Sequence, residues 1–121
     1  MKVRQDKIIQ AYALTDELKS KKDISVSVKW MLYQLRSALR PHCEFFAETE
    51  EEIKEKYREK ADENGKIYKE DAFNYQTEMN ELYTMEKDIQ LDKLKIKLSD
   101  CGDISVEEME KLDSFIEFEM E

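Results

Sequence analysis

Residues that favour tight turns are almost absent from this chain. Its 121 residues include only 2 Gly and 1 Pro. β-Sandwiches and β-barrels need a turn after nearly every strand, so this scarcity argues against both. The two glycines also lie far apart, which argues against a glycine-rich phosphate-binding loop. A chain of this length can build one modest core, so we expect a single, mostly α-helical domain over residues 1–121.

Apolar residues at helical spacing predict four helices, over residues 4–19, 25–61, 70–87 and 105–119. The second is expected to be a long, kinked central helix on which a helical bundle is built. From Val28 to Phe46 its apolar residues recur in alternating steps of four and three, as in the seam of a coiled coil. Pro41 lies inside this seam and predicts the kink. Thr49 begins a Thr-x-x-Glu capping pattern, so the segment is either one bent helix or two helices that meet near residues 47–49.

The apolar surface of this central segment is wider than one short neighbouring helix can cover. We therefore expect a homo-oligomer in which a second copy covers part of it. The residues expected at that interface are those of the seam, namely Val28, Leu32, Leu35, Leu39 and Phe46.

A minor β element is expected after the third helix. Over residues 88–98 apolar and charged side chains alternate, which is typical of a half-buried strand. A single strand is not stable alone, so it should pair with residues 66–68 or with its own copy in another protomer. The dipeptide Asn64-Gly65 predicts a turn just before the first of these partners. The short β element is therefore expected near residues 66–68 and 89–98.

Charge is distributed unevenly along the chain. Residues 1–43 have nine Lys or Arg against four Asp or Glu, whereas residues 99–121 have one against nine. The last predicted helix, which Ser105 opens with a capping box, is therefore strongly acidic. With a formal net charge of −9 at pH 7, the chain lacks the basic footprint that direct binding to nucleic acid needs. A polarised chain can instead hold an anion with its basic part, or pair that part with the acidic part of another copy.

The sequence predicts a cytoplasmic protein that has no contact with a membrane. No apolar run approaches the ~20 residues that a membrane span needs. The first residues are rich in charged side chains and do not form a signal peptide. Cys43 and Cys101 are too few for a disulfide framework and are expected to be reduced thiols.

The best candidate for a ligand site lies in the first half of the central helix. Tyr33, Arg36 and Arg40 share one helix face, and Trp30 lies nearby. Arginine donates paired hydrogen bonds to phosphate, and aromatic rings stack on bases, so these four residues could bind a small anionic, nucleotide-like ligand. The alternative is that both arginines pair with carboxylates of a neighbouring helix, as is common in charged bundles.

Neither catalysis nor a metal site is expected. His42 is the single histidine and would have to serve every proton-transfer role. Although it adjoins Cys43, adjacent helical residues point about 100° apart, and zinc needs three or four convergent ligands. His42 also falls on the apolar seam, as a packed histidine does. We therefore expect no enzymatic activity, no metal and no cofactor.

The order of these features is similar to that of a known protein family. A basic, aromatic helix leads into an acidic Glu/Lys helix, and a turn, a third helix, a short strand and a last capped helix follow. The chain resembles a family of short acidic proteins of unknown function encoded by tailed bacteriophages, over roughly residues 25–118. The residues that bear the resemblance are Asp62-Glu63-Asn64-Gly65-Lys66, Phe73-Asn74, Asn80-Glu81-Leu82, Lys97-Leu98-Ser99, Gly102 to Glu108, Leu112 and Phe115-Ile116.

This resemblance implies a bacteriophage origin and expression in the cytoplasm of a host bacterium, and it supplies no catalytic residues. In that setting we expect a non-enzymatic accessory protein that counteracts a host defence. It would sequester a small anionic signal or bind a host protein, the latter through its acidic C-terminal helix. The rival hypothesis is a structural or assembly-chaperone role in building the virion.

Overall fold

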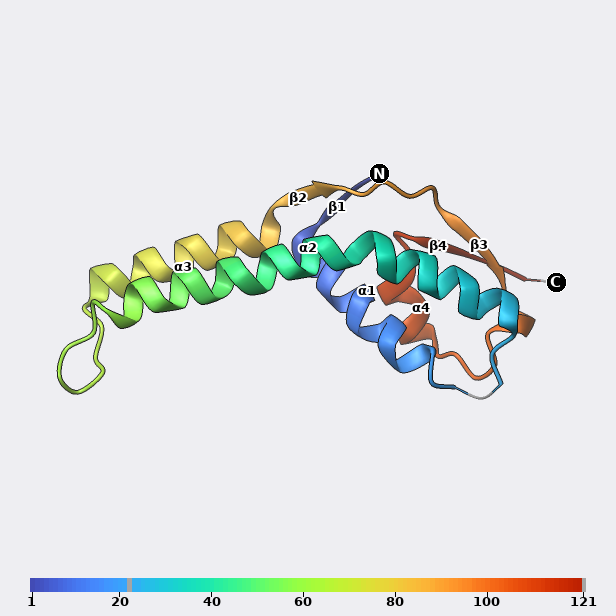
Figure 1. Cartoon of the computed structure of the whole chain (residues 1–121), viewed down its shortest axis with the longest axis horizontal. Helices are drawn as coiled ribbons and strands as arrows, with labels where there is room; N and C mark the ends of the chain where they lie inside the picture. The colour runs from blue at the N-terminus through green and yellow to red at the C-terminus, as the bar shows by residue number, and fades with distance from the viewer. Residues whose placement is uncertain (22, 121) are drawn as a thin grey trace.

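The computed structural model describes residues 1–21 and 23–120. It shows an elongated, mostly helical molecule in which a two-helix arm projects from a body that contains the other elements (Figure 1). The prediction of a helical bundle on a long central helix, with a minor β component, is confirmed. In chain order the elements are β1 (Lys2–Arg4), α1 (Gln5–Leu18), α2 (Val26–Arg58), α3 (Lys69–Thr84), β2 (Glu86–Asp88), β3 (Leu94–Lys97), the short 3-10 helix η1 (Leu98–Asp100), α4 (Val106–Leu112) and β4 (Ile116–Glu119).

The central helix α2 runs without interruption through both predicted break points. It begins after Ser25, whose hydroxyl accepts a hydrogen bond of 3.2 Å from the Val28 amide. Pro41 stands midway along its 33 residues, and Figure 1 shows α2 bent near its middle. A proline removes one backbone hydrogen bond and crowds the preceding turn, which accounts for a bend there. The alternative break at Thr49 does not occur.

The first half of α2 supplies one wall of the hydrophobic core. Val28, Leu32, Leu35 and Leu39 are at most 4% exposed. They pack in one cluster with apolar residues of α1, β3, α4 and β4. Their prediction as an oligomer interface is therefore wrong, because other segments of the same chain already cover them. Phe46, the fifth predicted interface residue, is half-buried and packs against Tyr83, with 5.3 Å between the ring centroids.

The second half of α2 pairs with α3 to form the arm. The arm is thin, and among its described residues only Tyr57, Met79 and Leu82 are buried. A tight loop closes its tip, where the Asp62 carboxylate accepts hydrogen bonds from two backbone amides of the loop. Residues 66–68 belong to this loop and not to a strand, which corrects the prediction. Lys66 closes the turn by exchanging hydrogen bonds with Asp62, and Tyr68 caps the start of α3 by accepting a hydrogen bond from the Ala72 amide.

The first strand pair joins the start of the chain to the segment after α3. β1 and β2 are antiparallel, with Val3 opposite Lys87. The helix predicted over residues 70–87 therefore ends at Thr84, because its last residues leave the helix to pair with β1. Val3 is buried in this pair, which gives the start of the chain an anchor in the core.

The second strand pair corrects the prediction for the last segment. The helix predicted over 105–119 ends at Leu112, and β4 lies parallel to β3. The register pairs Ile96 with Phe118 on the inner side and Lys97 with Glu119 on the outer side. The predicted strand near 89–98 is thus β3, and its partner is neither residues 66–68 nor another protomer. Alternation of apolar and acidic residues over 116–119 suits a strand that is buried on one face.

Candidate functional site

The four predicted ligand residues lie on α2 but divide into two groups. Trp30, Tyr33 and Arg40 point to solvent, whereas the Arg36 side chain is only 13% exposed. This difference follows from the packing of α1, which lies along one flank of α2 and covers Arg36.

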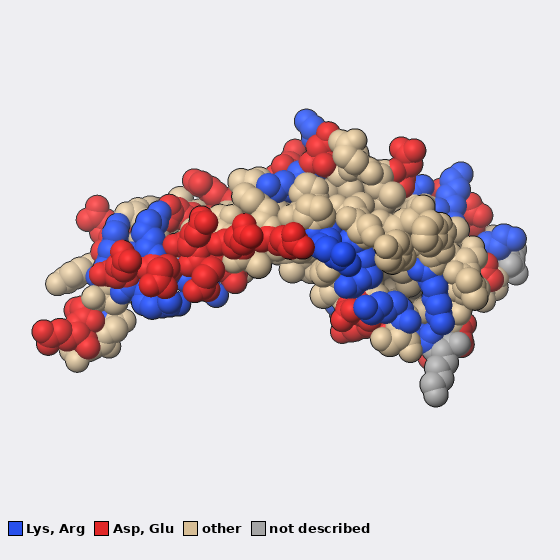
Figure 2. Space-filling model, viewed as in Figure 1, with Lys and Arg blue, Asp and Glu red and all other residues tan. Residues whose placement is uncertain are grey.

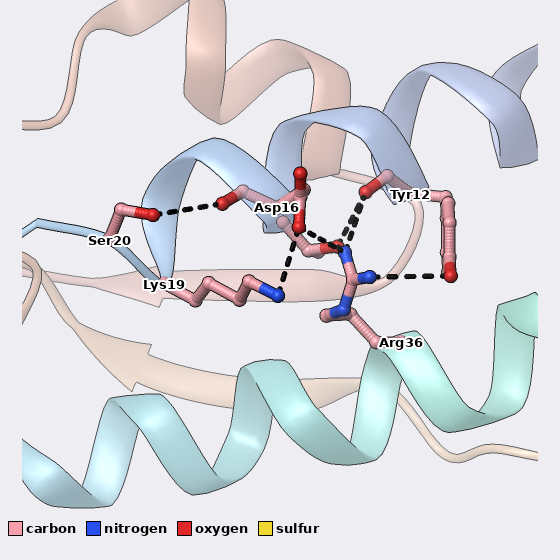
Figure 3. A network of polar contacts seen from close by, with 6 residues as sticks. Tyr12, Asp16, Lys19, Ser20 and Arg36 are labelled. Carbon is pink, nitrogen blue, oxygen red and sulfur yellow. Dashed lines mark hydrogen bonds and ion pairs between the residues drawn. The ribbon is translucent and has the colours of Figure 1, made fainter.

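Arg36 is bound on several sides by α1 (Figure 3). Its Nη1 donates hydrogen bonds to the Thr15 hydroxyl at 3.2 Å and to the Tyr12 carbonyl at 3.4 Å, and its Nη2 donates to the Tyr12 hydroxyl at 3.3 Å. The guanidinium lies 4.4 Å from the centroid of the Tyr12 ring. Asp16 forms an ion pair with Arg36 at 3.5 Å and with Lys19 at 3.0 Å. The alternative interpretation, pairing with a carboxylate of a neighbouring helix, therefore describes Arg36.

The Asp16 carboxylate connects this network to solvent. A hydrogen bond from Lys19, together with the charges of Lys19 and Arg36, lowers the pKa of Asp16 below its ordinary value of 3.8. Asp16 is therefore ionised at neutral pH and can pair with both cations. The network joins α1 to α2, and we assign Arg36 to holding these helices together.

The exposed residues form a continuous stripe along α2, on the side opposite the core. We call this stripe the outer face of α2. In the first half of the helix its members are Val26, Lys29, Trp30, Tyr33, Ser37 and Arg40. Trp30 and Tyr33 are each 59% exposed. Their rings stack on one another, with 5.6 Å between centroids and 17° between planes. Two large stacked rings left open to water are typical of an interaction surface.

Arg40 completes this stripe beside the aromatic pair. A hydrogen bond with Tyr12 is the main cause that raises the pKa of Arg40, and the charge of Glu44 acts in the same direction. The surface formed by Trp30, Tyr33 and Arg40 is the side of a helix, which covers a bound molecule from one direction only. Sites for small molecules instead enclose most of the ligand surface. The geometry thus suits a protein partner better than a small ligand.

The second half of α2 continues the same stripe with acidic residues. Glu44, Glu48, Glu51 and Glu55 are exposed and follow one another at helical spacing. Figure 2 shows acidic side chains along the arm half of α2, then Lys and Arg side chains, then an uncharged patch over the body half. The sequence already indicated a basic, aromatic segment followed by an acidic one, but sequence reasoning missed that both share one continuous helix face. The signal was available, since the same spacing connects Trp30 and Tyr33 to Arg40 and Glu44.

The His42–Cys43 pair does not form a reactive centre. Burial, and secondarily the charge of Lys87, lowers the pKa of His42 below 6.5. Burial raises the pKa of Cys43 to about 11, so at neutral pH it is a thiol and a poor nucleophile. Within residues 1–21 and 23–120, no group of three or more His, Cys, Asp or Glu side chains is placed to hold a metal ion.

No family model, curated protein or solved structure matches this chain. None of the helices in the described part of the chain is long and apolar enough to cross a lipid bilayer. The outer face of α2 is therefore the candidate site on the evidence of its own geometry.

Proposed function

We propose that this protein is a non-enzymatic binding protein that recognises a partner protein through the outer face of α2. The observation that supports this most is the stacked pair of Trp30 and Tyr33, which leaves more than half of each side chain in water. Exposed Trp and Tyr are enriched among the residues that contribute most to protein–protein binding. Arg40 at the end of the pair adds a donor for carboxylates of the partner.

The resemblance to short acidic bacteriophage proteins supports a role during phage infection of a bacterium. In it, the partner is a host protein and the outcome is the inhibition of a host defence in the bacterial cytoplasm. We propose α2 as the contact in place of the acidic C-terminal helix expected from the sequence. The helix expected there is reduced to α4, and the following residues pair as β4.

The test is affinity purification of the tagged protein from phage-infected bacteria, followed by mass spectrometry. We expect one host protein to be enriched with the wild-type chain and lost with the double variant Trp30→Ala, Tyr33→Ala. The matched control is Phe73→Ala, which removes an aromatic side chain of the arm that is 68% exposed. Equal recovery of the same proteins with both variants would overturn the proposed site. Enrichment of virion proteins would favour the assembly alternative.

Sequestration of a small anionic nucleotide is the second candidate. Arg40 beside the stacked rings of Trp30 and Tyr33 supports it, because a base could stack on the exposed ring face and a phosphate could bind the guanidinium. A thermal shift across a panel of cyclic nucleotides, lost in Arg40→Ala, would support this candidate. Unchanged melting temperatures with every nucleotide would remove it.

A further inference from the structure

The outer face of α2 has two halves that complement one another. The first half is aromatic and cationic, with Lys29, Trp30, Tyr33 and Arg40 exposed. The second half is acidic, with Glu44, Glu48, Glu51 and Glu55 exposed. Both halves lie on one uninterrupted helix, so their spacing is fixed. A surface that contains both members of a complementary pair can associate with itself through a two-fold axis.

We propose that a second copy of this chain binds here, with its α2 antiparallel to the first and the two-fold axis near His42. Such an axis brings together residues that lie equally far from it along the two helices. Arg40 then faces Glu44 of the second copy, and Lys29 faces Glu55 of the second copy. Each contact occurs twice. By the same rule, Tyr33 faces Glu51 of the second copy, and Trp30 faces Lys54, whose ammonium group can lie over the indole ring.

Arg40 and Glu44 lie closest to this axis. Within one chain the charge of Glu44 already acts on Arg40. In the dimer the two residues from each copy form a cluster of four alternating charges. Glu51 and Glu55 already pair with Arg58 of their own chain, so the pairs near the axis contribute most to the choice of register.

The size of the face predicts a weak dimer. A helix of 33 residues is about 50 Å long, and a stripe about 10 Å wide along it has an area of about 500 Å². Two copies would bury about 1,000 Å² in total, at the lower end for a specific interface. We therefore expect a dimer that forms at micromolar concentrations and dissociates as salt is added, because charged pairs at its rim are screened.

This inference deepens the proposed function, because it names the molecule that covers the outer face of α2 when no host protein is bound. A host partner and the second copy would then compete for Trp30 and Tyr33. The two proposals fail separately. Dimerisation is measured on the purified chain alone, whereas host binding is measured in infected cells.

The experiment is sedimentation velocity of the purified full chain and its charge-reversal variants across micromolar concentrations. We expect the wild type to dimerise, and Arg40→Glu and Glu44→Arg to be monomers when each is measured alone. An equimolar mixture of the two should form a heterodimer, since each variant supplies the charges that the other has lost. Trp30→Ala and Tyr33→Ala should each weaken the wild-type dimer about tenfold or more, whereas Phe73→Ala should not.

The mixture is the decisive measurement, because charge effects within one helix cannot produce it. Circular dichroism of each variant establishes that it is folded, and both reversed residues are exposed on the helix surface. A wild-type chain that stays monomeric throughout would overturn the proposal. So would a dimer that both charge reversals leave intact, or two monomeric variants that remain monomeric when mixed.

Discussion

The guanidinium of Arg36 lies 4.4 Å from the centroid of the Tyr12 ring and donates hydrogen bonds to the Tyr12 hydroxyl and carbonyl. This single side chain connects α2 to α1 through a stacking contact and an ion pair with Asp16. The arrangement removes Arg36 from the exposed stripe that contains Trp30 and Tyr33.

Arg36→Ala should lower the free energy of unfolding by about 2–3 kcal/mol, because it removes the hydrogen bonds to Tyr12 and Thr15, the ion pair with Asp16 and the contact with the Tyr12 ring. Urea denaturation followed by circular dichroism measures the change. Lys29→Ala is the matched control, because it removes another cation from the same helix, and its exposed side chain should change stability by less than about 0.5 kcal/mol. Equal effects of the two substitutions would contradict the assigned role of Arg36.

Gln5 provides a second test of the packing between α1 and α2. Its side chain is fully buried, and its Nε2 donates to the His42 carbonyl at 3.1 Å, while its Oε1 has no hydrogen-bond partner among residues 1–21 and 23–120. Gln5→Leu removes this unpaired acceptor at similar volume and should change stability by less than about 1 kcal/mol. Gln5→Ala leaves a cavity and should cost about 2–3 kcal/mol. If thermal unfolding shows the two to be equally destabilised, the amide makes a contact that the structure does not show.

Stability should decrease as the pH is lowered through the range just below 6.5. Burial lowers the pKa of His42 below its ordinary value of 6.5, so the folded chain favours the neutral ring. The unfolded chain then binds more protons in this range, and the free energy of unfolding falls with the pH. Denaturant titrations between pH 7 and pH 5 measure the slope. His42→Gln should flatten it, and an unchanged slope would mean that another group causes it.

The carboxylates act at lower pH. The hydrogen bond from Lys56 is the main cause that lowers the pKa of Glu78 below 4.5, and the backbone amide of Ser105 has the same effect on Glu108. Glu78 and Glu108 stabilise the folded state at neutral pH, and their contributions are lost as the pH falls below about 4.5, the ordinary pKa of glutamate. They therefore do not account for a change near pH 6.

The two glycines should respond differently to replacement. Both have positive φ, 76° at Gly65 and 65° at Gly102, so alanine is strained at either position. A Cβ at Gly65 meets open space, whereas at Gly102 it would lie 2.6 Å from the Asp23 carboxylate. Gly102→Ala should therefore lower the melting temperature more than Gly65→Ala. The reverse order would mean that Asp23 moves aside without cost.

Local sequence patterns predicted the elements whose causes are local. The seam from Val28 to Leu39 predicted the buried face of α2, and the capping box at Ser105 predicted where α4 begins. Asn64-Gly65 predicted the turn at the tip of the arm. In each case the determining contacts lie within a few residues of one another.

The remaining features depend on contacts between distant segments. Residues 112–119 fit a helix by the spacing of Leu112 and Ile116, and a strand by the alternation of Ile116 and Phe118. Pairing with β3 makes residues 116–119 a strand and not the end of a helix. Likewise, helical spacing puts Arg36 and Arg40 on one face, and the packing of α1 against α2 covers Arg36 while Arg40 stays exposed. Periodicity within one segment does not specify such partners.

Because the arm is thin, its helices should open locally more easily than those of the body. Beyond the body, the ring of Tyr57 on α2 packs edge-on against that of Tyr75 on α3, with 5.5 Å between ring centroids, and among the described residues the arm has only these two helices and the loop at its tip. Backbone amides near the tip should therefore exchange with deuterium through local opening, at a lower energetic cost than global unfolding. Amides around Leu35 should exchange only when the whole body opens, so one continuous helix would contain both the fastest and the slowest exchanging turns of the protein.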